Sequence, residues 1–255
     1  MRGLIVLINV FINGCNGRMG RTLISLINIS PVFNIVGGFD ISNNDSTSFQ
    51  VFTKINNIDV KPDVIIDFSN VDGTLNILDY ASKNHIPIVI ATTGFSKEQE
   101  QKIVEYSKTI PIFKSANMSY GINLMAKIVS EVAKKLSDTD IEIIETHHNQ
   151  KKDAPSGTAL LLANAINGVL DEKKDYVFDR HSKIEKRSKN EIGFSSIRGG
   201  NIVGEHIVQF YSPFDTFEIK HTAHSRELFA QGALKAAEFI VNQKENGIYV
   251  MNDLI

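Results

Sequence analysis

The sequence predicts an α/β protein in which a doubly wound parallel sheet is joined to a second, α+β domain with a mixed, largely antiparallel sheet. Three observations lead to this prediction. Apolar runs alternate with helical patterns in the first half, a glycine-rich turn follows the first run, and glycines and Ser212-Pro213 separate strand-like runs between Ile192 and His221. A chain of 255 residues is long enough for one large domain or two modest ones.

The apolar runs of the first half have the length of buried parallel strands. They are Ile5–Ile12, Asn34–Phe39, Val64–Phe68, Ile86–Ala91 and Ile110–Phe113. Helical patterns lie between them over Arg21–Ile29, Val71–Asn84 and Ser96–Lys108. Ser96 is well placed as a helix cap, with Glu98 and Gln99 in the first turn. Strands that alternate with helices are typical of a parallel sheet with crossover helices.

A second unit is expected after Asn117, where apolar residues recur at helical spacing over Tyr120–Leu136. A strand-like run over Asp140–His148 follows, and Pro155-Ser156-Gly157 opens a helix over Thr158–Val169. The charged segment Asp171–Asn190 is interpreted as a surface excursion. Strand-like runs then lead to a last helix over Glu227–Val241, expected to return to the first domain. The predicted boundaries are residues 1–118 with 226–255 for a dinucleotide-binding domain, and 119–225 for a substrate domain.

Two interpretations compete at the N-terminus. Arg2 and the apolar run Leu4–Ile12 have the charge and length of the first two regions of a signal peptide. The run passes directly into a glycine-rich turn, however, and a buried parallel strand is also a continuous apolar run. We therefore favour a strand.

Composition restricts the function. The net charge of −2 gives no general reason to bind nucleic acid or an anionic membrane, and no other segment approaches the ~20 apolar residues of a membrane span. The only cysteine, Cys15, excludes an intrachain disulfide and a multi-cysteine metal site. These features favour small-molecule chemistry in the cytoplasm.

The first run and the following helix flank Gly14, Gly17 and Gly20, an arrangement that lets a backbone approach a pyrophosphate at a helix N-terminus. The spacing GxxGxxG is a weak signal alone, but Asp40 ends the second run about 20 residues later, where a carboxylate binds an adenosine ribose. A carboxylate there repels a 2′-phosphate, and Ile41-Ser42-Asn43-Asn44 contains no arginine to neutralise one. We expect NADH to be preferred, or at least accepted beside NADPH.

Further loops follow strand ends at Thr92-Thr93-Gly94 and Ser115-Ala116-Asn117-Met118. In an open parallel sheet such loops line the ligand crevice. Ordinary turn chemistry explains either loop equally well when it is taken alone.

The segment Glu145–Thr158 is the most informative. It gathers His147, His148 and Lys151 before a helix N-terminus with Ser156, Gly157 and Thr158, so groups that bind a small dicarboxylate and supply a proton converge. Taken singly, each residue also has a structural explanation: the histidines as core residues, the lysine as a solvated surface residue and Ser156 as a helix cap. A zinc site is disfavoured because adjacent histidines on a strand point to opposite faces.

The motifs together resemble the bacterial dihydrodipicolinate reductase family. The resemblance is carried by Gly14–Gly20, Ala91–Phe95, Ser115–Asn117, Glu145–Thr158 and Ile202–His206, in order over nearly the whole chain. It implies a Rossmann-like domain completed by the C-terminal helix, and a middle domain that binds substrate and builds a homotetramer.

By motif position, the resemblance implies that His147 is an acid/base residue and Lys151 a proton donor, while His148, Gly157 and Thr158 match substrate-carboxylate positions. The matching cofactor positions are Gly14, Cys15, Asn16, Gly17, Arg18, Met19, Asp40, Ala91, Thr92, Thr93, Ser115, Ala116, Asn117 and Met118. Ala91 and Met118 depart from the commoner glycine and phenylalanine.

Two other functions agree less well with the sequence. A thiol-acylating semialdehyde dehydrogenase needs a catalytic cysteine in the substrate domain, whereas Cys15 lies in the glycine loop. A non-catalytic nicotinamide-binding sensor would not need the proton-donating cluster. The resemblance therefore implies NAD(P)H-dependent reduction of a cyclic dicarboxylate.

Overall fold

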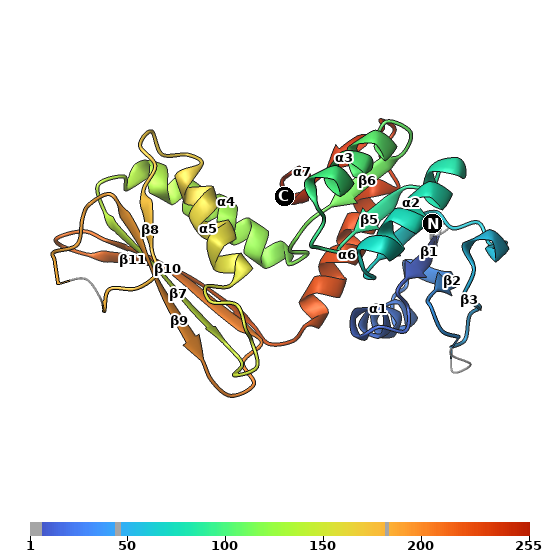
Figure 1. The fold of residues 1–255 in the computed structure, drawn as a ribbon, viewed down its shortest axis with the longest axis horizontal. Helices are drawn as coiled ribbons and strands as arrows, with labels where there is room; N and C mark the ends of the chain where they lie inside the picture. Colours follow the sequence, from blue (N-terminus) through green and yellow to red (C-terminus); the bar gives the residue numbers. More distant parts are fainter. Residues whose placement is uncertain (1–6, 44–46, 182–183) are drawn as a thin grey trace, which may run out of the picture. The chain divides into compact units, whose positions relative to one another are not determined.

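The computed structural model describes residues 7–43, 47–181 and 184–255. The described residues form two compact units, one from Met1–Ser119 with Glu227–Ile255 and the other from Tyr120–Arg226 (Figure 1). The beginning of the first apolar run, up to residue 6, and Asn44 lie outside the described residues. No helix in the described ranges is long and apolar enough to cross a membrane.

The first unit contains a 7-stranded sheet with the order β12-β6-β5-β4-β1-β2-β3, in which every pairing is parallel. The strands are β1 (Ile8–Asn13), β2 (Phe33–Phe39), β3 (Val51–Phe52), β4 (Val64–Asp67), β5 (Ile88–Ile90), β6 (Pro111–Lys114) and β12 (Gly247–Tyr249). The predicted parallel sheet is confirmed. The short strands β3 and β12 were not expected, because two or three residues carry no periodic pattern.

Helices cover both faces of this sheet, as the prediction of double winding requires. They are α1 (Arg18–Asn28), α2 (Val71–Lys83), α3 (Lys97–Tyr106), α6 (Glu227–Ile240) and α7 (Met251–Leu254), with a 3-10 turn η1 (Ile55–Asn57). One core cluster joins Leu23 of α1 and Ala233 of α6 to the sheet, and another joins Ile77 of α2 and Ile103 of α3 to it. The last long helix does belong to this unit.

The second unit contains a 5-stranded sheet with the order β11-β10-β7-β9-β8. Its elements are α4 (Tyr120–Lys135), β7 (Asp140–His147), α5 (Gly157–Asn167), β8 (Asp175–Val177), β9 (Glu191–Arg198), β10 (Gly204–Tyr211) and β11 (Thr216–Ala223). The mixed sheet is confirmed, but its pairings are two antiparallel and two parallel. Strands β7 and β8 run in the same direction, each parallel to β9, because α5 carries the chain back between them.

Helices α4 and α5 cover one face of this sheet. Along β7 buried and half-buried residues alternate, so Ile141 and Ile143 face the helices and join Val129 and Leu162 in a common core. Glu145 and His147 continue the same buried face toward the carboxyl end of the strand. The alternation of the strand therefore places two polar side chains where the apolar core ends.

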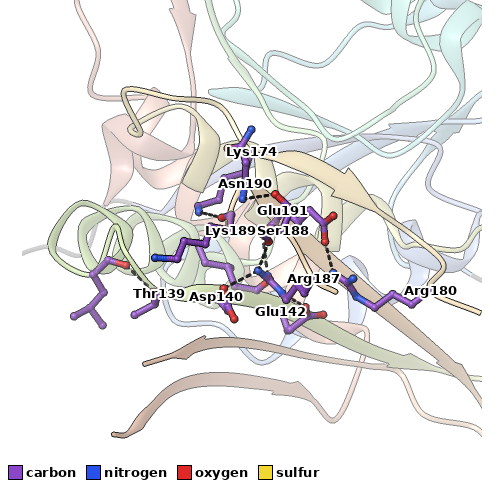
Figure 2. A network of polar contacts seen from close by, with 12 residues as sticks. Thr139, Asp140, Glu142, Lys174, Arg180, Arg187, Ser188, Lys189, Asn190 and Glu191 are labelled. Carbon is purple, nitrogen blue, oxygen red and sulfur yellow. Dashed lines mark hydrogen bonds and ion pairs between the residues drawn. The ribbon is translucent and has the colours of Figure 1, made fainter. Parts of the chain in front are cut away.

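The segment after β8 is anchored by Arg187, whose guanidinium lies 19% exposed among acidic and carbonyl groups (Figure 2). It donates to Asp140 Oδ1 at 2.8 Å, to Glu142 Oε1 at 3.1 Å and to three backbone carbonyls. Arg180 pairs with Glu191 beside it. The expected surface excursion thus includes the strand β8 and a bonded network. The sequence did not reveal this network because the acidic partners of Arg187 lie 45 and 47 residues away.

Candidate functional site

In the first unit, the carboxyl ends of five strands stand in one row. Phe39 of β2 pairs with Asn13 of β1, which pairs with Asp67 of β4, and Ile90 of β5 lies between Asp67 and Lys114 of β6. The loops that follow these residues therefore begin at a common edge. That edge is where open parallel sheets bind nucleotides.

The glycine turn brings backbone segments closer together than residues with side chains would allow. Gly14 has φ +81°, and a Cβ there would lie 2.7 Å from the carbonyl oxygen of Phe68. A Cβ on Gly20 would lie 2.3 Å from the Gly14 carbonyl oxygen, so the first turn of α1 reaches the loop only without a side chain. No side chain caps the first turn of α1, and it contains no acidic residue. The residues present therefore suit an anion such as a pyrophosphate.

A cavity of about 430 Å³ adjoins this turn and is lined by Gly14, Asn16, Gly17 and Asp40, all expected cofactor positions. Asp40 is fixed by bonds from the backbone N–H groups of Asn16, at 2.9 Å, and Ile41, at 2.8 Å. The cavity is also lined by residues that were not predicted to be cofactor contacts. These are Asn13, Arg21, Phe39, Ile41, Ser42, Phe68, Ser69, Asn70 and Gly73.

The other expected cofactor positions lie in different surroundings. Cys15 and Met118 are buried in the core, with 0% and 2% of their surface exposed. Burial, reinforced by the charge of Asp40, raises the pKa of the Cys15 thiol to about 11. Ala91–Thr93 and Ser115–Asn117 follow β5 and β6 at the same sheet edge but do not line this cavity. Arg18 and Met19 begin α1.

Asp67 at the end of β4 was not recognised from the sequence. Its fully buried carboxylate accepts from the Asn13 amide at 2.7 Å, from the Ser69 hydroxyl at 2.5 Å and from the Thr74 hydroxyl at 2.6 Å. It thereby ties the end of β1 to the loop before α2. Its position at the end of an apolar run could have identified Asp67 as a polar residue at the ligand-binding edge of the sheet. The same argument identified the residues that follow the neighbouring strands.

In the second unit, Glu145 and His147 form a buried pair on β7. Glu145 is 1% exposed, and its Oε2 lies 2.5 Å from Nδ1 of His147. Arg198 of β9 binds the carboxylate in a fork, with distances of 2.9 Å to Oε2 and 2.7 Å to Oε1. The backbone N–H of Ser156 adds a bond to Oε1. The carboxylate is thus held from three elements.

The charges of this cluster determine its protonation. Burial would raise the pKa of Glu145, but hydrogen bonds from Arg198, Ser196 and His147 together hold that pKa below its ordinary value. Burial lowers the pKa of His147. Glu145 opposes this shift, and the positive charges of Lys151 and Arg198 reinforce it. His147 is therefore largely neutral near pH 7, with a proton on Nδ1 facing the carboxylate.

The rings of His206 on β10 and His147 pack edge to face, with their centroids 5.0 Å apart and their planes at 74°. Nε2 of His206 lies 3.0 Å from the hydroxyl of Ser156, which also caps α5 through the N–H of Ala159. Burial, followed by the charge of His147, lowers the pKa of His206 to about 3. His206 is consequently neutral throughout the neutral range.

The remaining predicted residues surround this pair. Lys151 lies in the loop after β7 and binds Asp153 at 2.9 Å, and its charge acts on both His147 and His206. His148 is half-buried, and its backbone N–H bonds the carbonyl of Ile202. Gly157 and Thr158 begin α5, where the positive end of the helix dipole favours anions. The structure therefore brings the predicted substrate cluster together in one unit.

Sequence reasoning missed Arg198 and His206 and gave Glu145 no role. Glu145 has the same alternating position as His147, which was a usable signal, whereas Arg198 lies 53 residues away on another strand. Within the described part of the chain, no group of three or more histidine, cysteine, aspartate or glutamate side chains is arranged to hold a metal ion.

Known proteins resemble this chain over nearly its whole length. A family model described as dihydrodipicolinate reductase, N-terminus, matches residues 8–118, and the corresponding C-terminus model matches residues 121–255. A 4-hydroxy-tetrahydrodipicolinate reductase of Caldanaerobacter subterraneus is 50% identical over 250 residues, covering 98% of this chain and 99% of the relative. One from Clostridium novyi is 49% identical over 248 residues, covering 96% and 97%.

A solved structure also shares the fold. Dipicolinate-bound dihydrodipicolinate reductase from Paenisporosarcina sp. TG-14 has a TM-score of 0.81 and 24% identity, and the match covers 97% of this chain and 99% of that one.

Proposed function

The chain belongs to the dihydrodipicolinate reductase family, and we propose on this basis that it reduces 4-hydroxy-tetrahydrodipicolinate to tetrahydrodipicolinate with NAD(P)H, in lysine and diaminopimelate biosynthesis. The structural observation that best supports this function is the buried Glu145–His147 pair at a strand end, beside Lys151 and the N-terminus of α5. A cyclic dicarboxylate needs cationic groups for its charges and a proton source for its reduction.

We propose separate roles for the residues of the second unit. His147, neutral and protonated on Nδ1, offers an unprotonated Nε2 that accepts or relays a proton. Lys151 carries the proton for the reduced substrate, and Asp153 keeps its ammonium in place. His148, Ser156 and the N–H groups of Gly157 and Thr158 bind a substrate carboxylate.

In the first unit, we propose that the glycine turn and α1 hold the cofactor pyrophosphate, while Asp40 binds the adenosine ribose. The nicotinamide supplies the hydride when the cofactor is bound. The other proposed contacts lie at the same sheet edge or in the turn itself, and they are Cys15, Arg18, Met19, Ala91–Thr93 and Ser115–Met118.

NADH is the proposed preferred cofactor because Asp40 repels a 2′-phosphate. Arg21 lines the same cavity and offers a cation through which NADPH is still accepted. Comparing kcat/KM for both cofactors tests this proposal, and we expect Arg21→Ala to lower the efficiency with NADPH only. A large NADPH advantage in the unchanged protein would contradict the preference for NADH.

The activity is tested by following NADH absorbance after addition of freshly generated substrate. We expect turnover in the unchanged protein and a loss of about 100-fold or more in His147→Gln and in Lys151→Ala if both transfer protons. Lys152→Ala is the matched control, because Lys152 neighbours Lys151 but has no assigned role. Near-normal turnover in both site variants would remove these residues from the mechanism.

The reported relatives carry the name of an enzyme, so the comparisons give no support to a non-catalytic sensor.

We further propose a cytoplasmic homotetramer. The sheet face opposite α4 and α5 carries Ile144 and Ile207, paired across β7 and β10, and Ile197, 50% exposed, on β9. A second copy packed on this face would bury them, and light scattering measures the resulting mass.

A further inference from the structure

The carboxylate of Glu145 has no role of its own in the proposed chemistry, yet it is the most constrained acidic group near His147. It is 1% exposed and accepts hydrogen bonds from Arg198, Ser156 and His147. A buried carboxylate costs free energy unless its bonds are satisfied, and here the fork from Arg198 satisfies both oxygens. The chain thus holds a fully bonded negative charge directly behind one nitrogen of an imidazole.

We infer that Glu145, held by Arg198, is a positioning residue that fixes His147 with its Nδ1 proton on the carboxylate and so reserves Nε2 for proton transfer. This inference rests on the proposed function, in which His147 handles a proton. Neither Glu145 nor Arg198 needs to touch the substrate for this role.

The surroundings of Nε2 agree with it. No described residue forms a hydrogen bond with Nε2 of His147, and a Cβ on Gly204 would lie only 3.1 Å from this atom. A side chain at position 204 would therefore crowd Nε2, the nitrogen that the bond to Glu145 leaves without a proton. The ring packs against His206 in an edge-to-face arrangement, which restricts rotation of the imidazole away from this orientation.

Charges of opposite sign act on His147. Glu145, which lies on the same strand β7, raises the pKa of His147, whereas Lys151 in the following loop and Arg198 on β9 lower it. His206 on β10 also faces the ring, and Asp153 pairs with Lys151. Removing Glu145 must therefore lower the pKa of His147 further, and removing Arg198 must raise it. A merely structural disturbance that admits water would raise the pKa in both variants, because burial is what lowers it.

The test measures the pKa and tautomer of His147 by NMR of histidine-labelled full-length protein without ligands, with the resonance assigned by its loss in His147→Gln. We expect the Nδ1–H tautomer in the unchanged protein, a lower pKa in Glu145→Gln and a higher pKa in Arg198→Met. Glu142→Gln is the matched control, since Glu142 lies on the same strand and also pairs with an arginine. It should leave the His147 resonance unchanged.

Kinetics provide the second measurement. We expect Glu145→Gln to lower kcat by about 100-fold with little change in the KM for NADH, because the tautomer and not the cofactor site is affected. Glu145→Asp, which keeps the charge, should restore part of this loss. An unchanged kcat together with a raised or unaltered His147 pKa in Glu145→Gln would overturn the inference. A lack of reductase activity in the unchanged protein would instead refute the proposed function, and the NMR result would still decide the role of Glu145.

Discussion

Acid should destabilise this protein through His206, and the magnitude follows from its burial. The side chain is 4% exposed, and its pKa of about 3 compares with the ordinary value of 6.5. Because the folded-state pKa is the lower one, the unfolded chain binds the extra proton between these two values, and stability falls as the pH drops below about 6.5. At about 1.4 kcal/mol for each pKa unit, His206 costs about 2 kcal/mol at pH 5 and about 3 kcal/mol at pH 4.

Urea unfolding at pH 7.5 and pH 5.0, at one fixed protein concentration, measures this cost. The free energy of unfolding should fall less between the two values in His206→Gln than in the unchanged protein, by about 2 kcal/mol. His181→Gln is the control, since it removes an exposed imidazole. Equal losses in the unchanged protein and in His206→Gln would refute the reasoning that buried, neutral His206 resists protonation.

Two further predictions concern the glycine turn and the Arg187 network. Gly20→Ala should weaken NADH binding by at least about 10-fold in a fluorescence titration, because its Cβ would lie 2.3 Å from a backbone oxygen. Gly199→Ala should leave NADH binding unchanged, because no atom lies within 4 Å of the added Cβ. Equal NADH affinities of the Gly20→Ala and Gly199→Ala variants would contradict the proposed role of the glycine turn. Arg187→Met should lower the free energy of unfolding by about 2 kcal/mol, because buried acceptors lose their donors. Lys83→Met, which breaks an exposed helix pair, should leave it nearly unchanged, and a similar loss in both variants would argue against the network.

Local patterns were sufficient to predict the long elements. Ser96 caps α3 in a capping box with Gln99, as its position before a helical pattern indicated. The apolar runs became the central parallel strands, because burial on both faces requires continuous apolar sequence. The edge strands β3 and β12 escaped prediction, since their formation depends on a neighbouring strand and not on their own few residues.

Part of the candidate site could also be predicted from local sequence patterns. The sequence by itself determined that Lys151, His147 and Ser156 lie close together, because a strand end, a short loop and a helix N-terminus follow one another along the chain. It also determined the glycine turn, whose geometry is a property of consecutive residues. Whether these residues perform the proposed roles stays a prediction.

Only the tertiary structure decided which groups control the charges of these residues. Arg198 and His206 reach Glu145, His147 and Ser156 through strand pairing, from positions about 50 residues away in the sequence. Asp67 likewise joins Asn13, Ser69 and Thr74 only because β1 and β4 are neighbours in the sheet. The sequence specifies the type of each side chain, but its burial and the charges near it depend on packing. Burial and nearby charges determine the protonation of His147 and His206.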